Sequence, residues 1–398
     1  MFGLQPVLLR ASRTTCNCLA KSNHIKRKVV LRTLATPALK QNTDEENSIS
    51  VLHAASDPTK HTNDDYLKFY SIDKKIIQNN LSENVPKKFK ELSKALSEHT
   101  LMLRKPALKI IQQLENTDTS NKYVIYGPQG CGKSMSLLHV LHYAIQKDWV
   151  IVYIPNGFRL VDSQTATEVQ PCQWRPGRFD QPKESLIWLN SFRQLNFNYL
   201  QNNSTTQEYK WGKREMTEQG RPLLELIDQG ISRSLYANDA VGAILKELRI
   251  NTSTNILFAV DSFNGLYERS SHKVDGKMVD AQNLSLVHHF KKLMSPSYIL
   301  GDRSSYVFAL SQSGQYMGTK LTDLLEQDLL LNNEALEDLG DFHHIRMENY
   351  NQREFEAIMK FYKSKNWLTR DLSDSLLNEV HFLTGGNGTS VSKYAAFI

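Results

Sequence analysis

The chain has 398 residues, of which 40% are hydrophobic and 23% charged, and its formal net charge is +6. This length can hold one large domain with a small one attached, or two ordinary domains. No stretch approaches the roughly 18 consecutive apolar residues of a membrane-spanning helix, so we expect no span and at most a peripheral membrane association.

The positive charge is concentrated at the N-terminus. An acid-free start that is rich in Arg, Ser and Leu predicts a mitochondrial transit peptide, to which we assign residues 1–36. A basic arm for RNA is the alternative, whereas a secretory signal is disfavoured because Arg10 and Arg13 interrupt a short apolar stretch. Residues 1–43 contain no Asp or Glu but eight basic residues: Arg10, Arg13, Lys21, Lys26, Arg27, Lys28, Arg32 and Lys40.

The rest of the chain is close to neutral. Without those eight residues the chain has 40 basic and 42 acidic residues. This balance argues against binding of nucleic acid by overall charge, but it allows local basic patches that contact RNA. Beyond the leader only Cys131 and Cys172 remain, too few for a disulfide framework. Cys131 would sit beside a helix N-terminus, which could lower its thiol pKa and make it oxidisable; the alternative is a small loop filler.

Residues 37–79 are polar with few apolar anchors, which predicts a flexible linker or an extended arm, with folded structure beginning near Lys75. Apolar residues at helical spacing predict a helix over 87–104. A second helix is expected to begin at Pro106, because proline is favoured in the first turn of a helix.

The segment from Gly127 to Ser134 matches G-x-x-x-x-G-K-[ST], the phosphate-binding loop (P-loop). An apolar strand, 123–126, enters it, and a helical pattern over 136–145 leaves it, which is the context that the motif requires. Backbone N–H groups and the positive end of the helix dipole can then hold phosphate oxygens. The expected nucleotide-binding residues are Gly127, Pro128, Gln129, Gly130, Cys131, Gly132, Lys133 and Ser134.

Unbroken apolar runs at 149–154, 256–260 and 306–310 predict strands that are buried on both faces, as in a parallel sheet. Residues 342–347 are a fifth candidate strand. The sequence therefore predicts an α/β fold, a doubly wound parallel sheet of the P-loop NTPase type over 80–347, followed by a C-terminal helical subdomain over 348–398.

Two residues are candidates for Mg²⁺. Ser134 would offer its hydroxyl, and Asp261, at the end of a predicted strand, would contact the ion directly or through water. A strand-terminal Asp is also a common turn residue, which is the alternative. Many ATP hydrolases place a Glu directly after this Asp, but here it is Ser262. Glu268 could substitute, yet nothing positions it, so the catalytic residues stay unassigned.

Gln312 follows the strand at 306–310 and could face the γ-phosphate; ordinary loop chemistry explains it equally well. The N-K-x-D loop with which small GTPases read guanine is missing from the sequence. GTP, GDP and ATP therefore all stay open on the residues alone.

Aromatic and cationic residues alternate between Tyr209 and Arg214, a combination that can stack on bases and pair with phosphates. A solvated helix start is the alternative. RNA contact at this segment is therefore a hypothesis.

From about Val85 to the C-terminus, the chain resembles the family of death-associated protein three, phosphate-loop proteins of the mitochondrial small ribosomal subunit. The resemblance rests on ordered blocks at 85–108, 126–155, 178–192, 209–231, 238–249, 260–267, 309–314 and 349–368. It implies an AAA-like core that binds a guanine nucleotide with Mg²⁺. Ser262 stands where the family carries Gly, so the missing Glu is a family property, and the region before residue 80 departs from the family.

The resemblance further implies a structural ribosomal protein in the mitochondrial matrix that supports mitochondrial translation. Its partners would be small-subunit proteins and rRNA, with contacts to the large subunit, and no homo-oligomer is expected. Slow GTP hydrolysis is the most that the missing Glu allows. Two other hypotheses stay open: an active AAA-like NTPase that assists subunit assembly, and an apoptotic signalling adaptor.

Overall fold

A parallel β-sheet lies at the centre of the protein, seen here in a computed structural model that describes residues 50–82, 84–115, 120–163, 168–250, 254–295, 298, 300–301, 303–312 and 330–398. Within these residues the sheet has five strands in the order β13–β3–β12–β9–β4, and every neighbouring pair is parallel. The strands are β3 (Asn121–Tyr126), β4 (Val150–Ile154), β9 (Ile256–Asp261), β12 (Ser304–Ala309) and β13 (His343–Arg346). All five predicted strands, including the candidate at 342–347, are confirmed, as is the parallel P-loop type of fold.

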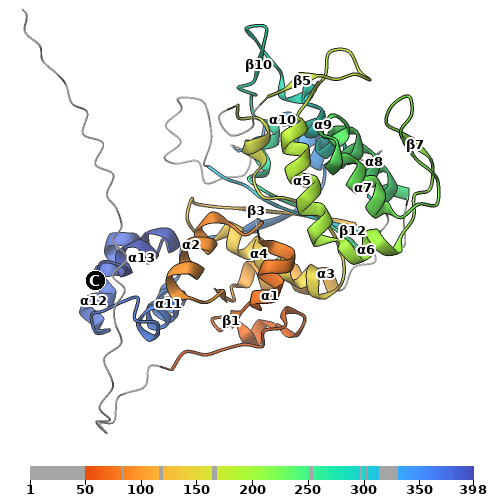
Figure 1. The fold of residues 1–398 in the computed structure, drawn as a ribbon. Helices are drawn as coiled ribbons and strands as arrows, with labels where there is room; N and C mark the ends of the chain where they lie inside the picture. The colour runs from red at the N-terminus through yellow and green to blue at the C-terminus, as the bar shows by residue number, and fades with distance from the viewer. Residues whose placement is uncertain are drawn as a thin grey trace, which may run out of the picture. The chain divides into compact units, whose positions relative to one another are not determined.

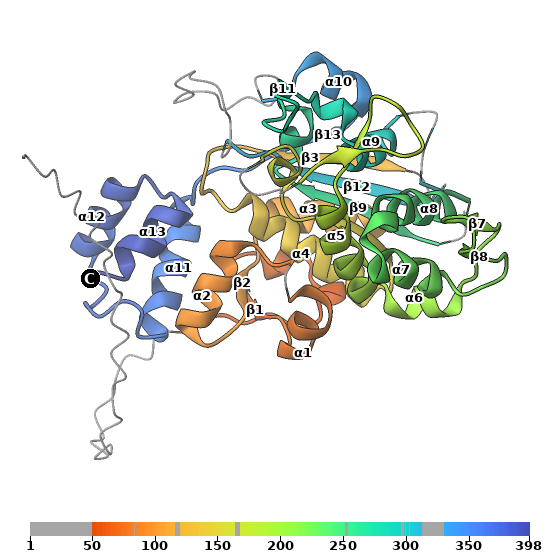
Figure 2. The ribbon, with the colours of Figure 1, turned by 45° about the horizontal axis from the view of Figure 1, so that its top comes forward.

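Alternate residues of each strand point into two separate cores, one on each face of the sheet. In β9, Phe258 belongs to one core while Leu257 and Ala259 belong to the other. Because both faces are covered, the strands read as unbroken apolar runs instead of alternating ones. One face is covered by α5 (Pro182–Leu195), α7 (Leu223–Ser232), α8 (Ala237–Ile250), α9 (Ser285–Lys292) and α10 (Asn333–Leu339), and the other by α2 (Lys87–Leu96), α3 (Lys105–Glu115) and α4 (Lys133–Gln146), as Figures 1 and 2 show.

Several further strands and helices are short. Among them are β1 (Phe69–Ser71), β2 (Thr100–Met102), α1 (Lys74–Ile76), α6 (Phe197–Asn202), β5 (Gln170–Pro171), β6 (Phe179–Asp180), β7 (Tyr209–Lys210), β8 (Met216–Thr217), β10 (Lys273–Val274) and β11 (Lys277–Met278). Among the residues described, no helix is long and apolar enough to cross a membrane.

Residues 37–79 were predicted to be a flexible linker or an extended arm, with folded structure beginning near Lys75; within the described residues 50–79, folded elements already precede Lys75. Strand β1 pairs antiparallel with β2, and Phe69 and Tyr70 are almost fully buried. Side chains of Asp57 and Thr62 cap the two short turns that precede these anchors. The predicted helix over 87–104 is also corrected: α2 ends before Ser97, whose left-handed φ of 58° stops it, and the chain then enters β2.

Three histidines attach this N-terminal segment to α4. His61 Nδ1 lies 2.9 Å from His139 Nε2, and its Nε2 lies 2.7 Å from the Ala55 carbonyl oxygen. The Tyr70 ring stacks on His142, one turn further along α4. Burial, together with the neighbouring His61, lowers the pKa of His142 to about 4, while Asp57 acts in the opposite direction. The packed arrangement therefore requires neutral imidazoles.

Helices α11 (Gln352–Ser364), α12 (Asp374–Thr384) and α13 (Gly388–Ala395) share an apolar core, which includes Phe355, Met359 and Val380 and also Phe69 of β1. A buried ion pair connects them to the sheet domain. Arg104 Nε lies 3.0 Å from Glu354 Oε1, and its Nη2 lies 2.8 Å from Glu354 Oε2. The same guanidinium donates to the Cys131 carbonyl oxygen at 2.6 Å, so one side chain links the P-loop to α11.

We predict that Glu354→Gln lowers the free energy of unfolding by about 3 kcal/mol, because it leaves the Arg104 charge buried without a counter-charge. Urea denaturation of the full chain measures this. Glu225→Gln is the matched control, since the Arg221–Glu225 pair is about half exposed and its loss is expected to cost about 0.5 kcal/mol or less. Equal effects of the two substitutions would contradict the role given to Arg104.

A second prediction concerns pH. The pKa of His142 in the fold, about 4, lies below its ordinary 6.5, so its contribution to stability is complete above pH 6.5 and is lost as the pH falls toward 4. Between pH 7 and pH 5 this amounts to about 2 kcal/mol from His142 alone. Replacing it by phenylalanine keeps the ring stacked on Tyr70 and removes the titration. Denaturation curves at both pH values should show a smaller difference for His142→Phe than for the wild type, and no such change for the exposed His53→Phe.

Candidate nucleotide-binding site

The P-loop lies between the end of β3 and the start of α4, where the sequence places it. Gly127, Gly130 and Gly132 all have positive φ, at 139°, 83° and 106°. A Cβ at Gly127 would lie 1.9 Å from the Met347 carbonyl oxygen, so no larger residue fits there. The glycines thus let the loop turn tightly against Met347, the residue that follows β13. The N–H groups of the loop lie at the start of α4.

Lys133 is 8% exposed, and its ammonium group donates to two carbonyl oxygens of the loop itself, Gly127 at 2.6 Å and Pro128 at 2.8 Å. Burial lowers the pKa of Lys133, an effect that Cys131 and Asp261 oppose. The ammonium group therefore lies within the loop, bound to its carbonyl oxygens. A change of side-chain rotamer would bring it to an anion bound at the loop.

Ser134 and Asp261 are brought together although 127 positions separate them. Asp261 ends β9, is 8% exposed, and accepts a hydrogen bond from the Ser262 backbone N–H at 2.8 Å. Burial raises the pKa of its carboxyl group, while a hydrogen bond from the Ser134 side chain, the Ser262 N–H and the nearby Lys133 charge act in the opposite direction. A hydroxyl and a carboxylate side by side at a P-loop are ligands that Mg²⁺ prefers.

Gln312 is directly in contact with the loop. Its Oε1 accepts a hydrogen bond from the Gln129 backbone N–H at 3.2 Å. Its position is fixed by Asn264, whose amide exchanges hydrogen bonds with the backbone of Ser311 at 2.9 and 3.0 Å. Because β12 lies between β3 and β9, its end necessarily reaches the space between the P-loop and Asp261.

Three residues at the P-loop were missed by the sequence reasoning. Asn387 caps the N-terminus of α13, and its Nδ2 also donates to the Gln129 carbonyl oxygen at 2.7 Å. The Thr389 N–H donates to the Gly130 carbonyl oxygen at 3.1 Å, and Arg104 contacts Cys131 as described above. The run Gly385-Gly386-Asn387-Gly388 is a turn and helix-start signal, yet nothing in it indicates where the helix would pack.

Cys131 does not have the lowered pKa that the sequence suggested. Its side chain is fully buried, and burial raises the pKa of the thiol, with Lys133 and Arg104 acting in the opposite direction. A buried neutral thiol is unreactive. The alternative, a small side chain that fills space inside the loop, fits this position.

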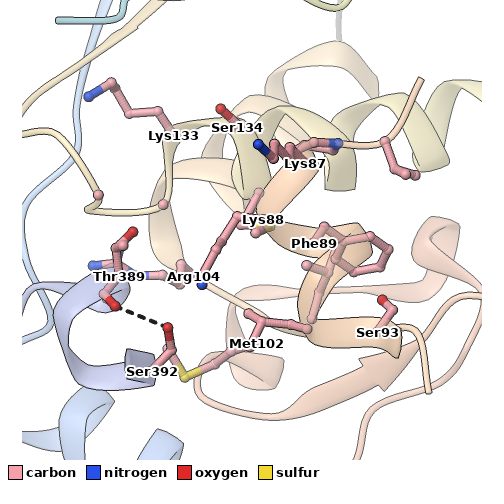
Figure 3. Close-up of a pocket in the computed structure, with 18 of the residues that line it drawn as sticks. Lys87, Lys88, Phe89, Ser93, Met102, Arg104, Lys133, Ser134, Thr389 and Ser392 are labelled. Atoms are coloured by element: carbon pink, nitrogen blue, oxygen red, sulfur yellow. Dashed lines mark hydrogen bonds between the residues drawn. The ribbon is translucent and has the colours of Figure 1, made fainter. Parts of the chain in front are cut away.

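A cavity of about 550 Å³ extends from the P-loop between the sheet domain and the C-terminal helices. Figure 3 shows Lys87, Lys88 and Phe89 of α2 on one side and Thr389 and Ser392 of α13 on another, with Ser134 at the loop. Apolar side chains such as Leu92, Met102 and Phe361 also line the cavity. The lining thus combines the P-loop with apolar side chains, a composition typical of small-molecule sites.

The carboxylates that line this cavity, within the described part of the chain, are Asp261 and Glu98. Glu98 is paired with Lys365 at 3.0 Å. Glu268, considered as a substitute base, is not among the lining residues. Ser262, next to Asp261, has a left-handed φ of 57°, a conformation that favours glycine.

The segment from Tyr209 to Arg214 is not a stacking surface. It forms strand β7 and the turn after it, and Trp211 is 3% exposed, with its Nε1 donating to Thr217 Oγ1 at 2.9 Å. The Tyr209 hydroxyl donates to Glu247 at 2.6 Å. Both rings serve the core, which corrects the RNA hypothesis for these aromatics.

The family model described as "Mitochondrial ribosomal death-associated protein 3" matches residues 101–394. A bovine relative, "Small ribosomal subunit protein mS29", is 32% identical over 352 residues, which cover 86% of this chain and 87% of the relative. The mouse protein of the same name is 33% identical over 350 residues, covering 86% and 88%. A Neurospora crassa protein with this name is 22% identical and covers 66% of this chain and 55% of its own length.

Among solved structures, a Walker-type ATPase of Pyrococcus abyssi is similar at 15% identity and a TM-score of 0.37, covering 73% of this chain and 65% of that one. An overlap this low carries no argument, and the fold class is established by the sheet order and the P-loop of this chain itself. Since the family model and two relatives span most of the sequence, the chain belongs to the family of mitochondrial ribosomal death-associated protein 3.

Proposed function

We propose that the protein is a structural component of the small subunit of the mitochondrial ribosome and acts in mitochondrial translation in the matrix. The observation that carries this is the similarity to bovine and mouse small-subunit proteins over 86% of the chain and nearly the whole of theirs. Its partners would be small-subunit proteins and rRNA, with large-subunit contacts and no homo-oligomer. Residues 1–36 would be the transit peptide, 80–347 the nucleotide-binding domain and 348–398 the helical subdomain.

The proposal includes a guanine nucleotide, GTP or GDP, with Mg²⁺ at the P-loop. The residues present fit this ligand: the N–H groups between Gly127 and Ser134 would hold phosphates, and Lys133 would add its charge. Ser134 and Asp261 would hold Mg²⁺, which would neutralise phosphate charge. Gln312, whose Oε1 accepts a hydrogen bond from the Gln129 N–H, would face the terminal phosphate. ATP is the alternative that the same phosphate-binding residues would also accept.

A structural use of the nucleotide is favoured over rapid turnover. Hydrolysis needs a group that orients the attacking water, and the two cavity carboxylates are already engaged, Asp261 with Ser134 and Glu98 with Lys365. Arg104, Asn387 and Thr389 all bind carbonyl oxygens of the P-loop. Ordering the loop would therefore also fix α11 and α13, and with them the surface that neighbouring molecules contact.

We predict that Lys133→Ala releases the nucleotide and reduces incorporation into the small subunit. Removing the ammonium should weaken nucleotide binding at least about tenfold, because one charge-assisted contact to phosphate is lost. The readouts are chromatography of nucleotide released from the purified protein and the amount of protein in small-subunit fractions. Lys147→Ala, an exposed lysine at the other end of α4, is the control. If the nucleotide-free variant assembled normally, a structural role of the nucleotide would be wrong.

The ribosomal role itself is tested by sedimentation of the endogenous protein from gently lysed mitochondria, beside a small-subunit RNA marker. We expect nearly all of it in small-subunit and whole-ribosome fractions. A large pool in light fractions would contradict the proposal and favour the apoptotic adaptor. Steady-state hydrolysis above about 0.1 per second with a partner present would instead favour an assembly NTPase.

A further inference from the structure

A cluster of cations lies on the side of the molecule formed by the β5–β6 hairpin, α8 and α9. These elements lie side by side in Figures 1 and 2, and Phe179 of β6 forms a bridge with Leu284 at the start of α9. We call this cluster the Arg–Trp patch; its members are Trp174, Arg175, Arg178, Arg249 and Lys292. It is remote in sequence from the P-loop and contributes nothing to the nucleotide cavity.

The hairpin that carries Trp174 and the first two arginines has a fixed shape. The Cys172 N–H donates to the Arg178 carbonyl oxygen at 2.8 Å, and the Arg178 N–H donates to the Arg175 carbonyl oxygen at 3.2 Å. Gly177, with a φ of 84°, makes the turn between the two arginines. The guanidinium groups therefore project from a built turn, which lowers the entropy lost when they bind a partner.

Four cations converge in this patch. Arg178 Nη2 lies 3.4 Å from His288 Nδ1, and Arg249 and Lys292 lie over the same Tyr298 ring at 4.3 and 4.2 Å. Burial lowers the pKa of Lys292, and the charges of Arg175, Arg249 and Arg178 lower it further. Within the part of the chain that the structure describes, none of the four cations forms an ion pair.

One carboxylate, that of Asp239, lies beside Trp174 at the edge of the patch. Asp239 accepts a hydrogen bond from Trp174 Nε1 at 2.8 Å, and its pKa is raised to about 6, chiefly by burial. This bond anchors one edge of the indole while the side chain stays 59% exposed. Trp174 is thus held as an open aromatic face among cations.

We propose that the Arg–Trp patch binds the sugar–phosphate backbone of RNA, with Trp174 stacking on an unpaired base. A planar guanidinium group can donate two hydrogen bonds to one phosphate, and an aromatic ring beside it can stack on a base of any identity. An acidic protein would need no exposed indole, and an anionic membrane would need a wider apolar face than one tryptophan provides. This proposal rests on the proposed function in one respect, namely that the RNA is the rRNA of the small subunit.

The test is binding of a fluorescein-labelled single-stranded RNA of about 20 nucleotides to the full chain, followed by fluorescence anisotropy between about 50 and 200 mM KCl. The triple variant Arg175→Ala, Arg178→Ala and Lys292→Ala should bind at least about thirtyfold more weakly at 100 mM. Its plot of log K against log[salt] should be shallower by about 2, since single-stranded binding loses about 0.7 per phosphate contact. The basic residues of 1–43 add the same background to every variant.

The matched control removes three charges elsewhere, with Arg193→Ala, Lys210→Ala and Arg221→Ala, whose cations are paired with Asp228, Glu208 and Glu225. It should bind RNA with nearly the wild-type affinity and slope. Trp174→Ala should weaken binding about tenfold, and Trp174→Phe should restore most of the loss. Photocrosslinking the RNA and mapping the crosslinked peptide should identify the one that contains Trp174.

Wild-type affinity and slope in the patch variant, or an equal loss in the control, would overturn the inference. The same holds if the patch variant keeps its affinity for RNA but loses binding to vesicles of anionic phospholipid or to a polyglutamate peptide. Either result would identify another class of partner. The nucleotide content and the urea midpoint of each variant report whether it is folded. Sedimentation of the wild type, measured separately, decides the ribosomal role whatever the outcome for RNA.

Discussion

The guanidinium of Arg104 is the group on which the arrangement of the molecule depends. Inside the protein it pairs with the Glu354 carboxylate, and it also donates to the carbonyl oxygens of Cys131 and Glu348. Its pKa is raised, because the Glu354 carboxylate outweighs the burial that acts in the opposite direction. A buried charge is tolerated only where its donors are satisfied, so the P-loop and α11 have to be in place together.

The P-loop is also held by contacts from the C-terminal helices. In addition to Arg104, the N-terminus of α13 binds the loop through Asn387 and the Thr389 N–H. Both contacts use carbonyl oxygens of the loop and not its N–H groups, of which that of Gln129 donates to Gln312. A ligand that orders these N–H groups would also order the carbonyl oxygens of the same short loop. Because those oxygens bind Arg104 and α13, the C-terminal helices would be ordered as well. This coupling supports the structural role that we propose for a nucleotide at the P-loop.

The sequence indicated the sheet and the P-loop well, but it indicated poorly the N-terminal segment 50–79 and the β7 segment at Tyr209 and Trp211. Strands such as 256–261 were predictable because a strand covered on both faces must be apolar at every position, and the P-loop glycines follow a strict spacing. Residues 50–79 were misread as a linker because their anchors, Phe69 and Tyr70, are few and widely spaced. Tyr209 and Trp211 were misread as an RNA surface because the pattern cannot indicate that Glu247 and Thr217 bind them.

The sequence by itself determined the fold class, the family and the local chemistry of the P-loop, since each depends on residues that are neighbours in the chain. Only the tertiary structure decided that Ser134 meets Asp261, that Gln312 contacts Gln129, and that α13 lies against the loop. It also brought Arg175 and Arg178 next to Lys292, more than 100 positions away. The physical reason is that burial and pairing depend on which elements pack together, and local propensity carries no information about contacts between distant segments.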